Sequence, residues 1–244
     1  SFGSLREFLF TVVFQAQKEK AVAYFEKLIP HTREIRELDL LLEFVPSTED
    51  LAQKKQRTVA ALALLEKWNK EGPLPKHVLA QSVKLNDPGA VIVLETLLGT
   101  YKDQPEKADF LLSLMLKMNT GESKDALRIA FKDSKFPAFI RKKIGASFVL
   151  KLNESKPYKA IEDVLASTAN ADKELRSTIL DQLKLLIHPK SSLGEGKRAD
   201  LIQRCVDLLK DIMDYTSDES FKSDVASLRG KMMDWLKEYN LKNS

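Results

Sequence analysis

Apolar residues recur at helical spacing along this chain, in short runs that end at proline, glycine or asparagine. The clearest example is the stretch from Leu85 to Pro137, which reads as helix, turn, helix, turn, helix. Asp87 followed by Pro88 is typical of a helix start, because aspartate caps free backbone N–H groups and proline has no N–H to satisfy there. No segment keeps a period of two, so we expect an all-α protein without strands.

The same pattern predicts about 12 to 13 helices in a single helical-repeat domain, residues 1–244. Two prolines and a glycine within 70–76 predict a bend, and 188–196 is expected to be an irregular loop before two C-terminal helices. The breaks between runs are short, which favours antiparallel neighbours. Helical runs are expected at 5–15, 21–28, 35–44, 47–69, 76–85, 88–99, 105–118, 122–131, 136–152, 157–166, 171–187, 197–215 and 219–239.

In some of these helices the positions of the apolar residues also predict which face of the helix packs against the core. The run at 5–15 carries an apolar stripe of the kind found in amphipathic helices, formed by Leu5, Phe8, Leu9, Val12 and Val13. In the run at 47–69, the residues expected to face the core are Val59, Leu62, Leu65 and Trp68. Trp235 is likewise expected to be a core residue, and Thr216 with Glu219 has the spacing of a capping box.

With 43% hydrophobic and 30% charged residues, the chain can bury a continuous core and still remain soluble. The net charge of +4, from 39 basic and 35 acidic residues, is too small to identify a nucleic-acid-binding protein by itself. The single cysteine, Cys205, excludes an internal disulfide and predicts a reducing compartment, cytoplasm or mitochondrial matrix. Because the chain begins with Ser1, we expect a processed protein or a piece of a longer one.

Alanine followed four residues later by an apolar residue recurs at regular intervals. The pairs are Ala21/Phe25, Ala90/Leu94, Ala126/Ala130 and Ala160/Val164. Two successive intervals are each about 35 residues and the first is about twice that, which is the range of helical-hairpin repeats. A small residue lets two helices approach closely, and Ala60/Leu64 would supply the missing pair slightly out of phase. The sequence therefore predicts a right-handed α-solenoid of antiparallel hairpins, with an irregular helical bundle as the alternative.

Residues 19–28, Glu-Lys-Ala-Val-Ala-Tyr-Phe-Glu-Lys-Leu, and residues 124–128, Lys-Asp-Ala-Leu-Arg, resemble the second helix of tetratricopeptide and pentatricopeptide repeats. The resemblance covers about residues 3–168. It implies a stack of helical hairpins with an extended concave surface that holds a protein segment. The resemblance to pentatricopeptide repeats implies RNA binding in an organelle.

Catalytic patterns are missing from the sequence. His31, His77 and His188 are far apart and are expected at the surface or at helix ends, and no Gly-x-Ser-x-Gly motif exists. The segment 191–198 lacks the first glycine and the Ser or Thr of a phosphate loop. We expect no enzyme activity, no cofactor, no metal, no small-molecule substrate and, without a long apolar run, no membrane insertion.

Basic clusters are the remaining candidate binding surface. They consist of Lys54, Lys55 and Arg57; Arg141, Lys142 and Lys143; and Lys184, Lys190, Lys197, Arg198 and Arg204. On one concave face these side chains could follow a phosphate backbone, whereas on separate faces they would be solvated and balanced by nearby acids. We therefore expect a non-enzymatic scaffold that binds a protein segment or packs in a larger assembly, with organellar RNA binding as the alternative.

Overall fold

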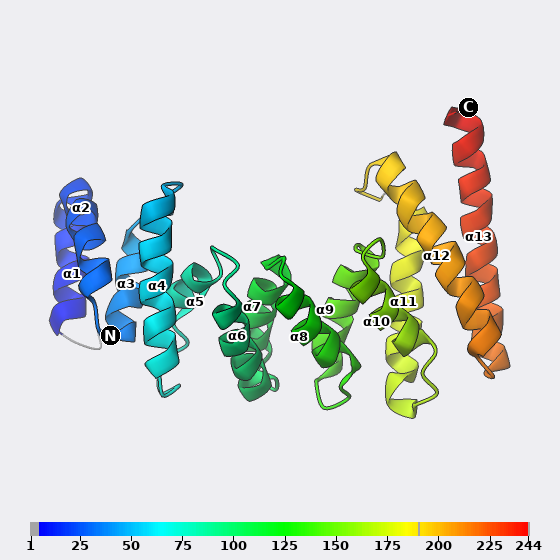
Figure 1. Ribbon diagram of the computed structural model, residues 1–244, viewed down its shortest axis with the longest axis horizontal. Helices are drawn as coiled ribbons and strands as arrows, with labels where there is room; N and C mark the ends of the chain where they lie inside the picture. Colours follow the sequence, from blue (N-terminus) through cyan, green and yellow to red (C-terminus); the bar gives the residue numbers. More distant parts are fainter. Residues whose placement is uncertain (1–4, 190, 244) are drawn as a thin grey trace. The chain divides into compact units, whose positions relative to one another are not determined.

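The computed structural model describes residues 5–189 and 191–243, and these residues form 13 α-helices, three short 3₁₀ helices and no strand (Figure 1). The predicted all-α class and the number of helices are confirmed. The α-helices are α1 Leu5–Ala16, α2 Lys18–Leu28, α3 Ile35–Phe44, α4 Leu51–Lys67, α5 Lys76–Ser82, α6 Pro88–Tyr101, α7 Pro105–Lys117, α8 Gly121–Lys132, α9 Ala138–Val149, α10 Ser155–Leu165, α11 Lys173–Lys184, α12 Glu195–Tyr215 and α13 Glu219–Asn243. The 3₁₀ helices are η1 Ile29–His31, η2 Asn170–Asp172 and η3 Leu185–Ile187.

The chain divides into two compact units, 1–123 and 124–244, and the division falls in the first turn of α8. The segment 70–76, where the sequence predicts a bend, lies within the first unit, where it follows α4 and ends at the first residue of α5. Gly72 there has a φ of +83°, a conformation that glycine adopts without steric cost. The organisation of 1–244 as one domain stays a prediction.

In the first unit, neighbouring helices pack as pairs, with α1 against α2, α4 against α5 and α6 against α7. Asp87 caps α6 as predicted, since its Oδ1 accepts a hydrogen bond from the Gly89 N–H at 2.8 Å. The core of this unit consists of fully buried side chains that include Phe25, Leu38, Leu41, Leu79, Leu94, Leu111 and Leu112. Helix packing thus buries one stripe of each helix and leaves the other face in solvent.

α1 departs from this rule. It is helical as predicted, but the apolar stripe is exposed, with Leu5 at 74% and Leu9 at 49%. The buried residue is Phe10, whose ring packs edge-on against Phe25 of α2 at 5.1 Å between centroids. α1 therefore contributes Phe10 to the buried core, stacks Phe14 on Phe44 of α3 at 4.4 Å between ring centroids, and presents its apolar stripe outward.

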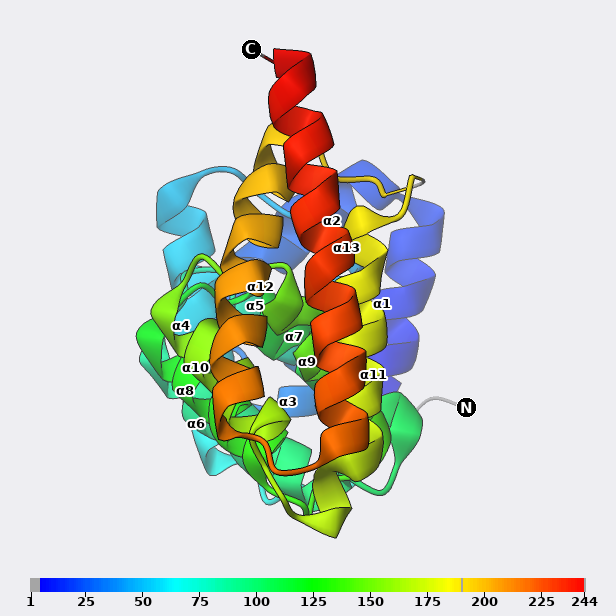
Figure 2. The same ribbon diagram turned by 90° about the vertical axis from the view of Figure 1, so that its right-hand side faces the viewer.

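In the second unit, the long helices α12 and α13 lie side by side and α11 packs against α13 (Figure 2). Cys205 of α12 is fully buried. Burial in apolar surroundings raises the pKa of its thiol, which disfavours the reactive thiolate. α13 starts differently from the prediction, because Asp218 accepts the N–H of Phe221 at 3.1 Å where a Thr216/Glu219 capping box was expected.

The alanine pairs behave as predicted in four cases and differently in the fifth. All eight side chains of the 21/25, 90/94, 126/130 and 160/164 pairs are buried. Ala60 and Leu64 on α4 are only partly buried. Val59, expected in the core, is 58% exposed, and both Trp68 and Trp235 are half-buried. The outer face of α4 is thus uncovered at the position where the repeat predicts a packed helix.

Candidate interaction groove

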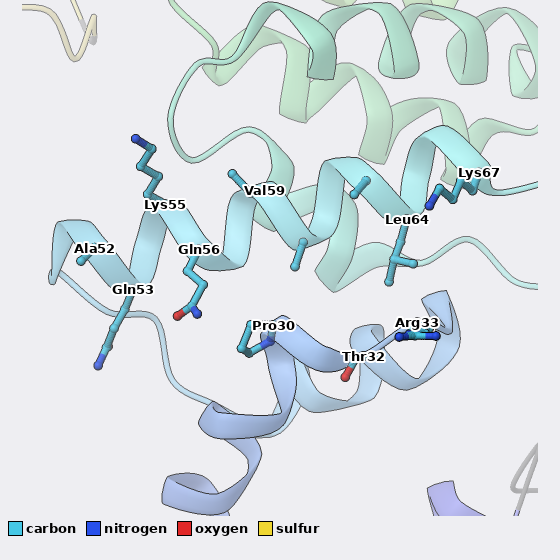
Figure 3. A pocket seen from close by; sticks show the side chains of 12 residues that line it. Pro30, Thr32, Arg33, Ala52, Gln53, Lys55, Gln56, Val59, Leu64 and Lys67 are labelled. Atoms are coloured by element: carbon cyan, nitrogen blue, oxygen red, sulfur yellow. The ribbon is translucent and has the colours of Figure 1, made fainter.

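An open groove of about 980 Å³ runs along α4 in the first unit (Figure 3). One side is the outer face of α4, and the other is the segment from Pro30 to Arg33 that links α2 to α3. Its α4 residues are Ala52, Gln53, Lys55, Gln56, Val59, Ala60, Ala63, Leu64 and Lys67. Lys55 and Lys67 are 12 positions apart, which corresponds to about 18 Å along a helix. The groove is therefore long enough for several turns of a partner helix.

The inner face of α4 fixes which residues point outward. Asp50 caps the helix, with its Oδ1 accepting the Gln53 N–H at 2.7 Å. Arg57 is buried and donates to the Glu26 carboxylate of α2 and, at 2.7 Å, to the Pro46 carbonyl. On the same face, Gln81 of α5 donates to the Thr58 hydroxyl at 3.1 Å. These contacts hold α4 against α2 and α5 and leave its opposite face open.

The floor of the groove is small and apolar. Ala60, Ala63 and Leu64 form it beside the exposed Val59, and none of these side chains presents a polar group. Small residues at successive turns let a second helix approach closely, as they do at the four buried alanine pairs. The surface has the shape and chemistry of a helix-packing face that lacks its helix.

Positive charge surrounds this floor. Arg33, Lys55 and Lys67 line the groove and are exposed, and no acidic residue is among its lining residues. In the part of the chain that the structure describes, none of the three cations has an ion pair within 4 Å. Their charges are available to an incoming group of opposite sign.

Only Lys55 of the sequence-predicted basic residues lines this groove. Arg57, Arg141 and Arg198 are buried and so do not contribute to an exposed basic face, contrary to expectation. The reason is that each guanidinium is held by other residues: Arg57 by Glu26, Arg141 by Asp172 and the Phe131 carbonyl at 2.8 Å, and Arg198 by the Trp235 ring.

Most of the other predicted residues are balanced by local acids. Lys54 lies 3.6 Å from Glu49, Lys142 lies 2.6 Å from Glu174, and Lys184 lies 2.8 Å from Asp181. Lys143 also interacts with a neighbouring group, Arg204 stacks on Tyr158, and Lys197 is exposed. Lys190 lies outside the described residues. The clusters are distributed over both units, and the structure brings together Lys54, Lys55 and Arg57 only as neighbours along α4.

Arg33 and Lys67 were not singled out from the sequence. The signal that pointed to this region was the Ala60/Leu64 pair, slightly out of phase with the other alanine pairs. Charge runs select residues that are adjacent in sequence, whereas Arg33 and Lys67 are brought to one groove by the packing of η1 beside α4. Tertiary contacts of this kind leave no local trace in composition.

Within the described ranges, no three His, Cys, Asp or Glu side chains gather closely enough to hold a metal ion. His31, His77 and His188 are all exposed, as expected. No helix of this part of the chain is both long and apolar enough to cross a membrane. In comparisons with known proteins, no family model, no curated protein and no solved structure matches this chain.

Proposed function

We propose that this protein is a non-enzymatic interaction scaffold, a right-handed solenoid of helical hairpins, that binds an acidic amphipathic helix of a partner protein along α4. The observation that carries the proposal is the α4 groove, with an apolar floor and three cations around it. A partner helix would place its apolar stripe on Ala60, Ala63 and Leu64 and its carboxylates near Lys55, Lys67 and Arg33.

The alanine pairs support a helical occupant. At four positions an alanine and its partner one turn later are covered by packed helices, and at Ala60/Leu64 the same arrangement is uncovered. A helix of the partner would bury this fifth pair in the same way. An extended peptide would use the groove less well, because residues 5–189 and 191–243 offer no sheet edge that could supply backbone hydrogen bonds.

The test uses a short fluorescent peptide with leucines on one helical face and glutamates on the other. We expect saturable binding that weakens as salt rises, since exposed charges are screened over about 8 Å at physiological salt. The variant Lys55→Glu/Lys67→Glu should weaken binding by about tenfold, or about 1.4 kcal/mol. A peptide with glutamine in place of glutamate should bind the wild type less well.

A matched control is Lys210→Glu/Lys231→Glu, which makes the same change of charge at two exposed lysines of the second unit. It should leave binding unchanged. Ala63→Trp tests the shape of the groove without changing charge, because a large side chain on the floor prevents close approach of a helix. Equal binding by wild type, Ala63→Trp and the groove charge reversal would contradict the proposal.

RNA binding remains the second proposal, with less support. Exposed cations such as Lys55, Lys67 and Lys197 are compatible with phosphate contacts. The burial of Arg57, Arg141 and Arg198 removes three residues of the predicted basic surface. Titration of labelled single-stranded RNA over a salt series would separate the two functions. Tight RNA binding with a steep salt dependence, together with no peptide binding, would favour RNA.

A further inference from the structure

Arg198 differs from the other buried arginines. Four arginines are buried in the described chain, and three of them pair with a carboxylate from elsewhere in the fold: Arg57 with Glu26, Arg141 with Asp172, and Arg176 with Asp218. Arg198 of α12 is only 6% exposed, and its guanidinium has no ion pair or hydrogen bond to any residue of 5–189 or 191–243. Its Nε is buried without a partner.

The guanidinium lines a pocket of about 450 Å³ between the start of α12 and the last turns of α13. Its Cζ lies 4.7 Å from the centroid of the Trp235 ring, which covers one face of the group. Tyr239 stacks against Trp235 with centroids 5.5 Å apart and an angle of 7° between the rings. The pocket therefore combines an aromatic platform with a guanidinium that has no hydrogen-bond acceptor among the described residues.

The buried Nε of Arg198, which has no acceptor, favours an anion at this position. The guanidinium stays charged at any physiological pH, and a buried charge without a partner is costly. Cation–π contact with Trp235 compensates part of this cost but leaves the buried Nε without an acceptor. The fork of donors matches a carboxylate, which accepts two parallel hydrogen bonds from one guanidinium.

The walls of the pocket select the kind of anion. Glu195 and Glu238 line it together with Lys242, so two carboxylates stand beside two cations. A phosphate with two negative charges would be repelled by both glutamates, whereas a carboxylate carries a single charge. Trp235 and Tyr239 offer ring surface to an apolar or aromatic body attached to that carboxylate.

We infer that this pocket binds a carboxylate joined to an apolar or aromatic body, with Arg198 holding the carboxylate and Trp235 and Tyr239 contacting the body. The carboxylate belongs either to a free organic acid or to an acidic side chain of a partner peptide. This site lies in the second unit, and the inference is independent of the function proposed for the α4 groove.

The experiment follows Trp235 fluorescence in a Trp68→Phe background, which leaves one tryptophan in the chain. The probe is 3-phenylpropionate, with its amide and inorganic phosphate as controls. We expect a saturable change with the acid and none with the amide or phosphate. A second arm uses a capped peptide with one glutamate between leucines. Its binding would identify a partner's acidic side chain as the source, and binding of the free acid alone would identify an organic acid.

Variants at Arg198 test the role of the guanidinium. Arg198→Met should weaken binding of the acid at least tenfold, and Arg198→Lys should weaken it less because it keeps the charge but loses the fork. Glu238→Gln should strengthen binding a few-fold, because it removes a repelling charge. Circular dichroism verifies that each variant keeps its helices. If Arg198→Met does not fold, the comparison of binding between the wild type and Arg198→Lys tests the role of the guanidinium.

Three kinds of result would overturn the inference. The first is a failure of discrimination, either equal binding of the acid and its amide or equal binding by wild type and the Arg198 variant that folds. Another is tighter binding of phosphate than of the acid. The third is a loss of stability in Glu195→Gln or Glu238→Gln as large as in Arg198→Met, because this would show that Arg198 pairs with its own chain in solution.

Discussion

The guanidinium of Arg57 in α4 is bound by the carboxylate of Glu26 in α2, with Nε donating to Oε1 at 3.1 Å and Nη2 donating to Oε2. Nη1 of the same group donates to the Pro46 carbonyl at 2.7 Å. Each of the three guanidinium nitrogens thereby donates one hydrogen bond on one side of α4. This pair sets the rotation of α4 about its own axis, and so it decides that Val59 and Lys55 face the open groove.

Removal of Glu26 should therefore destabilise the first unit. Glu26→Ala leaves the Arg57 charge buried without a carboxylate, a change that costs about 3–5 kcal/mol in fully buried pairs. The Glu26 side chain is 23% exposed, so water screens part of the loss and we expect about 2 kcal/mol. Urea unfolding, followed by Trp68 fluorescence in a Trp235→Phe background, measures the change.

Glu19→Ala is the matched control, because Glu19 is an exposed glutamate on the same helix. Its unfolding midpoint should stay close to that of the wild type. If Glu26→Ala and Glu19→Ala unfold at the same urea concentration, the Arg57 pair does not hold α4 in place.

Local sequence signals predicted the helices well. α3 has the predicted bounds 35–44, and Asp87 caps α6, because proline and capping residues act within one turn of their own position. The four buried alanine pairs were also predicted, since a small residue at helical spacing reports on close packing wherever the partner helix comes from.

The orientation of individual helices was harder to predict. Periodicity assigns arginine to the surface, yet Arg57 is buried because Glu26, 31 positions earlier, compensates its charge. With Arg57 and Thr58 inside, Val59 must point outward. The groove depends on the long-range pairing of Arg57 with Glu26, and the pocket depends on the absence of such a pairing for Arg198. Neither can be recognised from the residues nearby in the sequence.

Acid should weaken the second unit through Asp172. Burial would raise the pKa of this carboxyl, but hydrogen bonds from Ser167 and Arg141 outweigh it and lower the pKa below its usual value. An unfolded aspartate has a pKa near 3.9, so the stabilisation is complete above about pH 4 and is lost as pH falls through the folded pKa.

Asp172→Asn should accordingly be less stable than the wild type at pH 7, by about 2 kcal/mol, because Arg141 loses its counter-charge. The difference should shrink as the pH falls below about 4. Urea unfolding followed by Trp235 fluorescence, in a Trp68→Phe background, gives both values. Asp200→Asn, at an exposed aspartate of α12, should match the wild type at pH 7. A difference for Asp172→Asn that stays constant from pH 7 to pH 3 would contradict this account.

Truncation of two neighbouring residues of α1 should change the free energy of unfolding by very different amounts. Phe10 is buried against Phe25, so Phe10→Ala should cost about 3 kcal/mol. Leu9 is 49% exposed, so Leu9→Ala should stay within about 0.5 kcal/mol of the wild type. Urea unfolding of the first unit measures both. A large loss for Leu9→Ala would mean that another surface covers the α1 stripe in solution.

Asp39 of α3 caps α5 from another part of the chain. Its Oδ1 accepts the backbone N–H groups of His77 at 2.7 Å and Val78 at 2.9 Å, and Pro75 at the start of α5 has no side chain that could do so. Asp39→Ala should therefore destabilise the first unit by about 1–2 kcal/mol, the range for loss of a helix cap.

Asp39→Asn separates the role of the acceptor oxygen from that of the charge. Burial raises the pKa of Asp39, which means that the fold disfavours the ionised carboxylate relative to the unfolded chain. Asparagine keeps an acceptor for the two N–H groups and carries no charge, so its unfolding free energy at pH 7 should lie within about 0.5 kcal/mol of the wild type. Equal losses for Asp39→Asn and Asp39→Ala would show instead that the negative charge at the start of α5, and not the accepted hydrogen bonds, stabilises this helix.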